Sequence, residues 1–159
     1  RSVAQVHHHL YRLPDIGAID FRQYVTDLCA ALAQAAFPPT GLHLRCHCDQ
    51  AYMPRNRAIA IGLVTNELVT NAVSIPNDKA GKIDVRFEQS DAGWTLSVSD
   101  DGIGFSQPQS KAGLGTSLLE EFARQAGGIL SIEAGSGTLA RLVLPSSAAQ
   151  PFVQDGTDV

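Results

Sequence analysis

Three polar side chains stand out because their types and spacing suit the binding of a metal ion or a phosphate-bearing ligand. Glu67 and Asn71 lie four residues apart in N-E-L-V-T-N-A, within a stretch typical of a helix, so both project from one helix face. An amide oxygen such as that of Asn71 can ligate a hard cation, and magnesium prefers oxygen ligands. Asp100 ends the alternating segment G-W-T-L-S-V-S-D and has the parity of its apolar residues. It therefore continues the inward face of a predicted strand.

Glycine-rich segments follow these residues in a fixed order. D-D-G-I-G spans residues 100–104, G-L-G spans 113–115, and G-S-G-T spans 135–138. Gly102 and Gly104 lack side chains and leave room for a ligand to approach the backbone. G-L-G precedes a predicted helix, whose first N–H groups can bind phosphate. Each segment alone is a common turn and indicates no particular function, whereas the order of the segments along the chain is far less common.

In this order, the four segments resemble the ATP-binding domain shared by sensor histidine kinases, gyrase-type ATPases and Hsp90-type chaperones, over about residues 55–145. The resemblance implies a Bergerat-type α/β (α+β) fold, a two-layer sandwich whose mixed, mainly antiparallel sheet is covered on one face by helices. ATP and magnesium are the implied cofactors. Asn71 is the implied magnesium ligand, Glu67 the general base, and Asp100 the acceptor for the adenine amino group. The implied nucleotide-binding set also contains Gly102, Gly104, Gly113, Leu114, Gly115 and Thr138.

Within this family, N-E-L-V-T-N-A, G-L-G-T-S-L-L and A-R-Q-A-G-G are similar to bacterial histidine kinases with short lids. V-H-H-H-L-Y-R near the N-terminus resembles the end of the second helix of their dimerisation hairpin. The implied partners are that hairpin, whose acceptor histidine lies outside residues 1–159, a response regulator, and a second copy of the full-length protein. His7, His8 and His9 point in three directions around a helix. We interpret them as helix-end residues rather than phosphoacceptors.

Two departures from the family pattern keep other functions open. Ser74 and Ile75 stand where the family usually has a basic and then an aromatic residue, and the loop over residues 74–81 is short. A degenerate, non-enzymatic domain that serves as a phosphotransfer or docking scaffold is therefore one alternative. A serine kinase of the anti-sigma-factor type is another, because it shares the ATP-binding segments but has no dimerisation hairpin.

Composition agrees with one folded domain of 159 residues. Hydrophobic residues make up 44% of the chain, and the net charge of -4 disfavours nucleic acid as a partner. No apolar run approaches the roughly 20 residues that a membrane span needs. The chain begins at Arg1 rather than Met, so we expect a piece of a longer, cytoplasmic or membrane-anchored protein. The expected division is a hairpin end and linker over 1–19, the ATP-binding domain over 20–145, and a flexible tail over 146–159.

The three cysteines are predicted to be structural. In L-H-L-R-C-H-C, strand alternation places Leu44, Cys46 and Cys48 on one face and the two histidines on the other. Thiols and imidazoles would then be separated, which disfavours a metal site. We expect buried core cysteines, and their odd number fits a reducing cytosol.

The predicted elements alternate between helix and strand periodicity. Asp20 is the expected N-cap of the second helix, and Gly127-Gly128 is expected to end the last one. In that last helix, Leu118, Leu119, Phe122 and Ala126 are predicted to face inward. The predicted helices are 1–12, 21–36, 54–73 and 115–126, and the predicted strands are 42–48, 82–88, 93–100, 129–134 and 138–144.

Overall fold

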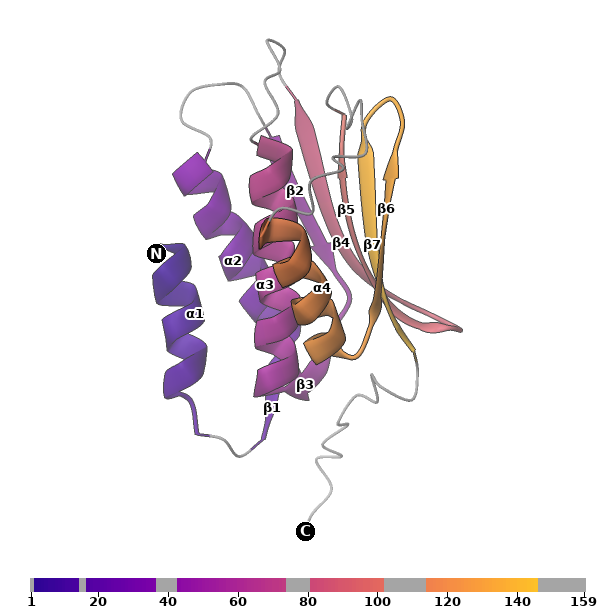
Figure 1. Ribbon diagram of the computed structural model, residues 1–159. Helices are drawn as coiled ribbons and strands as arrows, with labels where there is room; N and C mark the ends of the chain where they lie inside the picture. The colour runs from indigo at the N-terminus through magenta and orange to yellow at the C-terminus, as the bar shows by residue number, and fades with distance from the viewer. Residues whose placement is uncertain (1, 15–16, 37–42, 74–80, 102–113, 146–159) are drawn as a thin grey trace.

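The computed structural model describes residues 2–14, 17–36, 43–73, 81–101 and 114–145. These residues form two layers, a sheet and the helices that cover one of its faces (Figure 1). The elements are, in chain order, α1 (Val3–Arg12), β1 (Ala18–Asp20), α2 (Phe21–Ala36), β2 (His43–Cys48), β3 (Tyr52–Pro54), α3 (Arg55–Val73), β4 (Lys82–Ser90), β5 (Gly93–Asp100), α4 (Leu114–Ala126), β6 (Ile129–Ala134) and β7 (Thr138–Pro145).

The five-stranded sheet has the order β2-β4-β5-β7-β6. β2 runs parallel to β4, and the other neighbouring pairs are antiparallel. The predicted fold class, a mixed and mainly antiparallel sheet with helices on one face, is therefore confirmed (Figure 1). A separate two-stranded sheet of β1 and β3 was not predicted. Each of its strands has three residues, which is too few to show an alternating pattern.

Aromatic packing ties the helical layer to the sheet. Phe21 of α2 lies 4.7 Å from Phe87 of β4 between ring centroids, and Phe87 stacks on Trp94 of β5 at 5.0 Å. All three side chains are buried, and each such burial stabilises the fold by about 1.5–3 kcal/mol. The alternating residues of β4 and β5 thus supply the sheet half of the core, as their periodicity predicts.

The predicted helix ends at Asp20 and Gly127 are confirmed. The Asp20 carboxylate accepts a hydrogen bond from the Gln23 N–H at 3.1 Å, as an N-cap does. Gly127 has a φ of 80°, and Gly128 N–H donates to the Ala123 carbonyl, which is the Schellman arrangement.

The predicted burial is wrong for one residue of α4. Leu118 is 44% exposed, whereas Leu119 and Ala126 are buried and Phe122 is partly buried. Ala123, which the prediction omitted, takes a place on the buried stripe. Residues 119, 123 and 126 are spaced by three or four residues and form one buried face of the helix. Leu118 precedes Leu119 by one residue and therefore lies outside that face.

The cysteine prediction is right for two of the three residues. Cys29 and Cys48 are buried, but Cys46 of the edge strand β2 is exposed. A hydrogen bond from the Cys29 thiol lowers the pKa of Cys46, while burial raises the pKa of Cys48 to about 12. Among the described residues, no group of three or more His, Cys, Asp or Glu side chains is placed to hold a metal ion.

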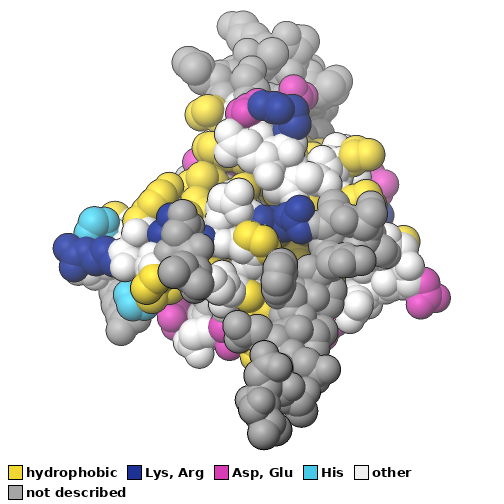
Figure 2. Space-filling model, turned by 90° about the horizontal axis from the view of Figure 1, so that it is seen from below, with side chains coloured by type: hydrophobic (Ala, Val, Ile, Leu, Met, Phe, Trp, Pro, Cys, Tyr) yellow, Lys and Arg dark blue, Asp and Glu magenta, His cyan; other side chains and the backbone are white. Residues whose placement is uncertain are grey.

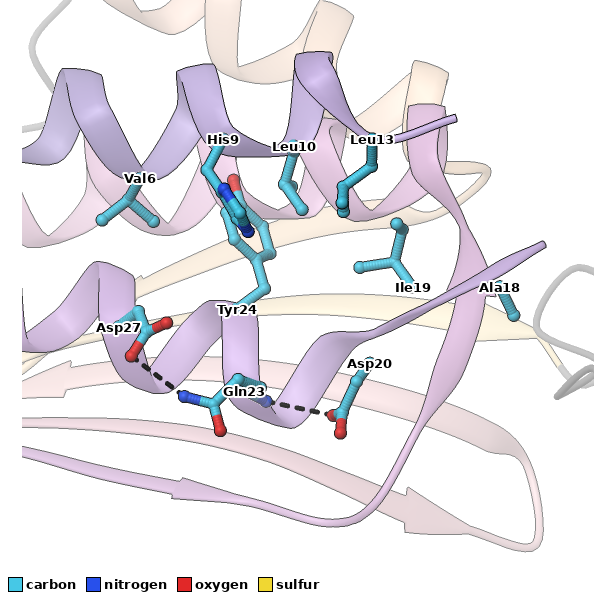
Figure 3. A pocket seen from close by; sticks show the side chains of 10 residues that line it. All are labelled: Val6, His9, Leu10, Leu13, Ala18, Ile19, Asp20, Gln23, Tyr24 and Asp27. Carbon is cyan, nitrogen blue, oxygen red and sulfur yellow. Dashed lines mark hydrogen bonds between the residues drawn. The ribbon is translucent and has the colours of Figure 1, made fainter. Parts of the chain in front are cut away.

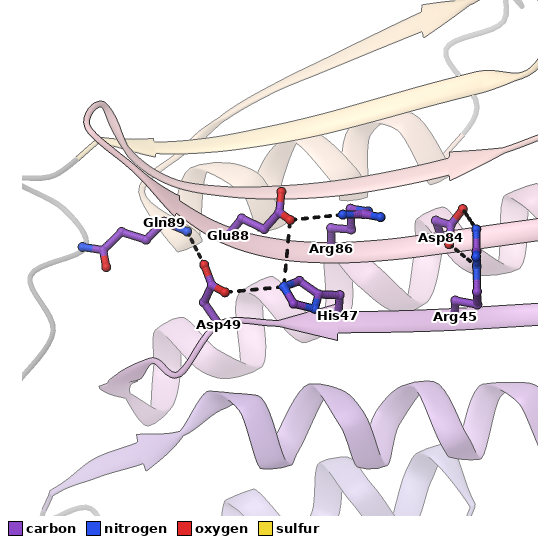
Figure 4. Close-up of polar contacts among 7 residues, drawn as sticks. All are labelled: Arg45, His47, Asp49, Asp84, Arg86, Glu88 and Gln89. Atoms are coloured by element: carbon purple, nitrogen blue, oxygen red, sulfur yellow. Dashed lines mark hydrogen bonds and ion pairs between the residues drawn. The ribbon is translucent and has the colours of Figure 1, made fainter.

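The surface carries both charge signs. On the face shown in Figure 2, Lys and Arg side chains are scattered among acidic and hydrophobic ones. On the outer face of the sheet, Arg45 makes a bidentate ion pair with Asp84 at 2.7 and 2.9 Å (Figure 4). None of the described helices is both long and apolar enough to span a bilayer.

Candidate functional site

A small cavity lies where α3 crosses the ends of β5 and β7. Its volume is about 30 Å³, which is room for a water molecule rather than for a larger ligand. Apolar side chains form most of its wall, and three polar residues from three elements complete it. The lining residues are Leu68, Asn71, Ala72, Val98, Asp100, Ile132, Thr138 and Ala140.

Asp100 and Thr138 enter this cavity side by side because they are direct register partners. Asp100 is the last residue of β5 and pairs with Thr138, the first residue of β7. Opposed residues of an antiparallel pair point to the same face, with Cβ atoms about 5 Å apart. Asp100 is half-buried, and Thr138 is buried. Among the described residues, no group hydrogen-bonds the buried Thr138 Oγ1. A buried hydroxyl in this state favours a polar ligand or a water molecule in the cavity.

Asn71 reaches the same cavity from α3. The core-facing side of this helix is fixed by buried Ile61, Val64 and Leu68, which leaves Asn71 at the mouth of the cavity, exposed to solvent. Glu67 lies one turn earlier, half-buried, and does not line the cavity. The structure thus brings together Asn71, Asp100 and Thr138, three residues that the sequence analysis singled out, and places Glu67 one turn from them.

The turn before β7 approaches the cavity so closely that only glycine fits at position 137. A Cβ on Gly137 would collide with the backbone carbonyl oxygen of Asp100. By contrast, a Cβ on Gly135 would meet nothing within 4 Å. The N–H of Gly135 donates to the Gly137 carbonyl at 2.8 Å and closes the turn. Gly137 therefore sets how near β7 lies to the end of β5.

The remaining predicted residues are only partly placed. Gly102, Gly104 and Gly113 lie outside the described residues, as do Ser74, Ile75 and the expected tail. Leu114 and Gly115 are the first residues of α4, so a helix begins close to the position that the sequence predicts. Its first backbone N–H groups are the ones expected to bind phosphate.

Sequence reasoning missed the apolar walls of the cavity. Ile132 of β6 pairs with Ala140 of β7, which in turn pairs with Val98 of β5, so the three form one row across the sheet. Their register with Asp100 and Thr138 was not derivable from spacing along the chain. It required knowing that β5 and β6 both pair with β7.

A second, larger hollow, the groove, lies between α1 and α2 (Figure 3). It has a volume of about 400 Å³ and is lined by Val6, His9, Leu10, Leu13, Ala18, Ile19, Asp20, Gln23, Tyr24 and Asp27. The hydroxyl of Tyr24, one of the lining residues, forms a hydrogen bond of 2.9 Å with His7 Nδ1. Burial lowers the pKa of His7 and raises that of Tyr24. A Cβ on Gly62 of α3 would collide with the Tyr24 hydroxyl, so this glycine admits Tyr24 between α1 and α3.

Arg55 joins the end of α1 to the start of α3. Its guanidinium donates to the carbonyl oxygens of Leu13 at 2.8 Å and Tyr11 at 3.4 Å. A cation at the C-terminal end of a helix is favourable because the last carbonyls carry partial negative charge. The N-terminal helix is thus attached to the same helix that carries Glu67 and Asn71.

Comparisons with known proteins identify the family and the fold of the chain. Residues 56–148 match the family model described as histidine kinase-, DNA gyrase B- and HSP90-like ATPase, and residues 1–36 match a histidine kinase model. A comparison with curated proteins finds no match.

Three solved structures show how far the fold is shared. A histidine kinase domain from the blue-light activated histidine kinase of Erythrobacter litoralis EL346 aligns with a TM-score of 0.81 at 20% identity, over 92% of this chain and 78% of that one. The Acinetobacter baumannii histidine kinase AdeS aligns with a TM-score of 0.66 at 19% identity, over 91% and 75% of the two chains. The mycobacterial sensor histidine kinase MprB aligns with a TM-score of 0.64 at 18% identity, over 82% and 97%.

The family match covers more than half of the chain and includes every described residue of the cavity. The histidine kinase match covers α1 and α2 as well. The chain therefore belongs to the histidine kinase-, DNA gyrase B- and HSP90-like ATPase family, and within that family it is an ATP-binding histidine kinase domain.

Proposed function

We propose that this domain binds Mg-ATP at the cavity between α3, β5 and β7 and, in a longer parent protein, transfers the γ-phosphoryl group to a histidine outside residues 1–159. The observation that carries the proposal is the convergence of Asp100, Thr138 and Asn71 on one apolar cavity. Ligand sites are typically apolar pockets with a few polar groups that fix orientation. The buried Thr138 hydroxyl, which lacks a partner among the described residues, supports a polar ligand there.

Asp100 and Thr138 would hold the adenine end of the nucleotide. A carboxylate at the end of an inward-facing row can accept a hydrogen bond from an exocyclic amino group, and Val98 and Ala140 offer an apolar surface to the ring. The cavity of about 30 Å³ is smaller than a purine, so binding requires it to widen. Ile132, on the β6 side of the cavity, is 45% exposed and is the lining side chain best placed to turn outward.

Asn71 and Glu67 would act at the phosphate end. The Asn71 amide oxygen is a suitable magnesium ligand, and the ion would neutralise charge on the phosphates. Glu67 would accept the proton of the attacking group, or orient that group, as general base. The glycines 102, 104 and 113 and the backbone of Leu114 and Gly115 would surround the phosphates, because a helix N-terminus supplies unpaired N–H groups.

The N-terminal part would connect this site to the dimerisation hairpin. We assign residues 1–19 to the hairpin end and linker and residues 20–145 to the ATP-binding domain. Buried Val6 and Leu10 pack α1 against the core, and His7 is hydrogen-bonded to Tyr24 rather than free to reach a phosphate. This arrangement supports an acceptor histidine elsewhere in the parent, a homodimeric parent, and a response regulator as the final phosphate acceptor. The expected location is the cytoplasm, where ATP is available.

A nucleotide titration tests the proposal. A fluorescent ATP analogue added to the domain should give saturable binding with magnesium and weaker binding with EDTA. Asn71→Ala should remove most of this magnesium dependence and leave the magnesium-free affinity unchanged. Absence of saturable binding at millimolar nucleotide would instead favour the non-enzymatic scaffold. The histidine kinase match over residues 1–36 supports the histidine kinase over an anti-sigma-factor-type serine kinase.

The two carboxylates can then be separated in the parent protein, where the acceptor histidine is present. Glu67→Gln should leave nucleotide affinity nearly intact and reduce phosphoryl transfer by about 10²-fold or more, the usual contribution of general base catalysis. The fragment alone should give no phosphohistidine at His7, His8 or His9. Acid-labile label mapped to any of these three would show that the acceptor assignment is wrong.

A further inference from the structure

The carboxylate of Asp101 attaches the end of β5 to the start of β4. The Asp101 N–H donates to the Lys82 carbonyl at 3.3 Å, and Asp101 Oδ1 accepts the Lys82 N–H at 2.7 Å. In the hydrogen-bonded pairs of an antiparallel ladder, each of two opposed residues donates its N–H to the other's carbonyl. Here the side-chain oxygen of Asp101 replaces its own backbone carbonyl. Both backbone groups of Lys82 are satisfied, and the ladder ends one residue beyond Asp100.

This attachment holds Asp100 from one side while Gly137 holds it from the other. Asp100 pairs with Ile83 of β4 and with Thr138 of β7, so it is the last residue of β5 in both ladders. On the β7 side, Gly137 lies in direct contact with the Asp100 carbonyl and leaves no space for a Cβ. On the β4 side, the pair formed by Asp101 and Lys82 is the next attachment beyond Asp100.

We propose that Asp101 is a positioning residue that fixes the Asp100 carboxylate for recognition of the adenine amino group. The proposal rests on the function proposed above. Asp101 itself is exposed and lies outside the cavity lining, so it acts through the backbone of Asp100. A hydrogen bond between a carboxylate and an amino group requires distances within a few tenths of an ångström. Without the Asp101 carboxylate, the end of β5 loses one of its two hydrogen bonds to Lys82. The backbone of Asp100 is then held less firmly beyond its last ladder pair, and its carboxylate has room for the small shift that matters.

The role of Asp101 needs an acceptor oxygen rather than a negative charge. Its partner is a backbone N–H, which any side-chain oxygen at the same place can accept. Asparagine at this position keeps that oxygen and loses the charge, whereas alanine loses both. Asp101→Asn is therefore the conservative variant expected to preserve the site.

Asp49 provides a matched control at the opposite end of β4. Its N–H donates to the Phe87 carbonyl at 2.8 Å, and its carboxylate accepts the Gln89 N–H at 3.0 Å (Figure 4). Like Asp101, Asp49 combines a backbone and a carboxylate hydrogen bond to β4, but its partners are two residues, Phe87 and Gln89, instead of one. Its carboxylate also forms an ion pair with His47 at 3.5 Å. However, Asp49 directly follows β2 and lies beside the end of β4 that is far from Asp100. Asp49→Ala removes a comparable bond without touching the end of β5.

The test compares the affinities of wild type, Asp101→Ala, Asp101→Asn and Asp49→Ala for ATP and for inosine triphosphate, which lacks the adenine amino group. Asp101→Ala should weaken ATP binding about tenfold, the value of roughly one hydrogen bond, and leave inosine triphosphate binding unchanged. Asp101→Asn and Asp49→Ala should both keep ATP binding within about twofold of wild type. A purely structural role of Asp101 would not change the ratio of the two affinities.

A second variant removes the same hydrogen bond from its other end. Lys82→Pro deletes the N–H that Asp101 accepts, and proline is tolerated at the first residue of a strand. It should reproduce the loss of discrimination between the two nucleotides, and it decides the question if Asp101→Ala does not fold. Unchanged discrimination in the folded variants, an equal loss in Asp49→Ala, or no retention in Asp101→Asn would overturn the proposal. Failure of the wild-type protein to bind ATP would instead overturn the proposed function.

Discussion

Two of the hollows among the described residues differ in both size and chemistry. The groove between α1 and α2 has about 400 Å³ and the cavity beside α3 about 30 Å³. Tyr24 lines the groove, and its hydroxyl is already hydrogen-bonded to His7. The cavity gathers an amide, a carboxylate and a hydroxyl from three elements, and the buried hydroxyl has no partner among the described residues. Beside the groove, His7 Nε2 is likewise buried without a partner in the described part of the chain. The proposed nucleotide site is therefore chosen by the convergence of polar groups rather than by the amount of space.

A glycine stands beside each hollow, and the two glycines contact different kinds of atom. A side chain on Gly62 would meet the end of the Tyr24 side chain, whereas one on Gly137 would meet the backbone of Asp100. A contact with a side chain strains the packing, whereas a contact with a backbone in a sheet ladder strains the pairing of the strands. The groove is thus held by packing, and the cavity is held by strand register.

The largest effect is expected from Gly137→Ala. The added Cβ displaces the end of β5 and with it the Asp100 carboxylate, so ATP affinity should fall by more than about tenfold, beyond the value of one hydrogen bond. Gly135→Ala is the control, because its Cβ has open space around it. Calorimetric titration with ATP measures both variants. Equal affinities for the two would show that the turn before β7 does not position Asp100.

Gly62→Ala should affect the other region. Tyr24 is 4% exposed and has little room to move, so the new methyl group overpacks the α1–α3 contact and should reduce the free energy of unfolding by about 1–3 kcal/mol. ATP affinity of the folded protein should stay near the wild-type value. Urea unfolding and ATP titration of the same sample measure the two quantities. A loss of affinity as large as that of Gly137→Ala would remove the distinction between the groove and the cavity.

Thr138→Val should separate stability from binding inside the cavity. Valine has nearly the same shape, and it removes a buried hydroxyl that has no partner among the described residues. The free energy of unfolding should therefore stay level or rise by about 1 kcal/mol, while ATP affinity falls several-fold. Thr65→Val is the matched control, since the Thr65 hydroxyl donates to the Ile61 carbonyl at 2.9 Å. It should lower stability and leave ATP affinity unchanged. The opposite pattern in the two variants would contradict the assignment of Thr138.

The smallest effect is expected on the pH dependence of stability, through His7, which is hydrogen-bonded to Tyr24. Burial lowers the pKa of His7 below its usual 6.5, so the unfolded chain binds this proton more readily than the folded one. The contribution of neutral His7 to stability is present above about pH 6.5 and is lost as the pH falls below that value. Unfolding free energies at several pH values, for wild type and His7→Gln, test this. A pH dependence that is the same in both proteins would show that His7 is not the titrating group.

Most of the fold was predictable because its elements carry clear periodicity. The inward parity of Asp100 along β5, the N-cap at Asp20 and the glycine end of α4 all follow from local sequence, and the structure confirms them. Cys46 and Leu118 were predicted to be buried and are exposed. Their exposure depends on which strand lies at the sheet edge and on how far α4 is rotated, and neither is encoded locally.

Part of the candidate site was predictable because some of its residues are marked by local sequence patterns. Asn71 and Asp100 were identified from residue type, spacing and resemblance, and the structure places them on one cavity. The close approach of Gly137 to Asp100 and the bond between Asp101 and Lys82 were not anticipated. Both depend on cross-strand pairing between residues far apart in sequence. Local patterns show which face of a strand is buried, but pairing decides which residues meet.

The central claim is that Asp100 reads the adenine of a nucleotide bound at the cavity, and one paired titration tests it most directly. ATP is titrated calorimetrically, with magnesium present, into the wild-type domain and into Asp100→Asn, whose amide preserves the shape but changes one acceptor oxygen into a donor. We predict saturable binding at one site in the wild type and an affinity at least about tenfold lower in the variant, because a hydrogen bond to a charged acceptor is lost. Equal affinities in the two proteins, or no saturable binding by the wild type at millimolar ATP, would contradict the account.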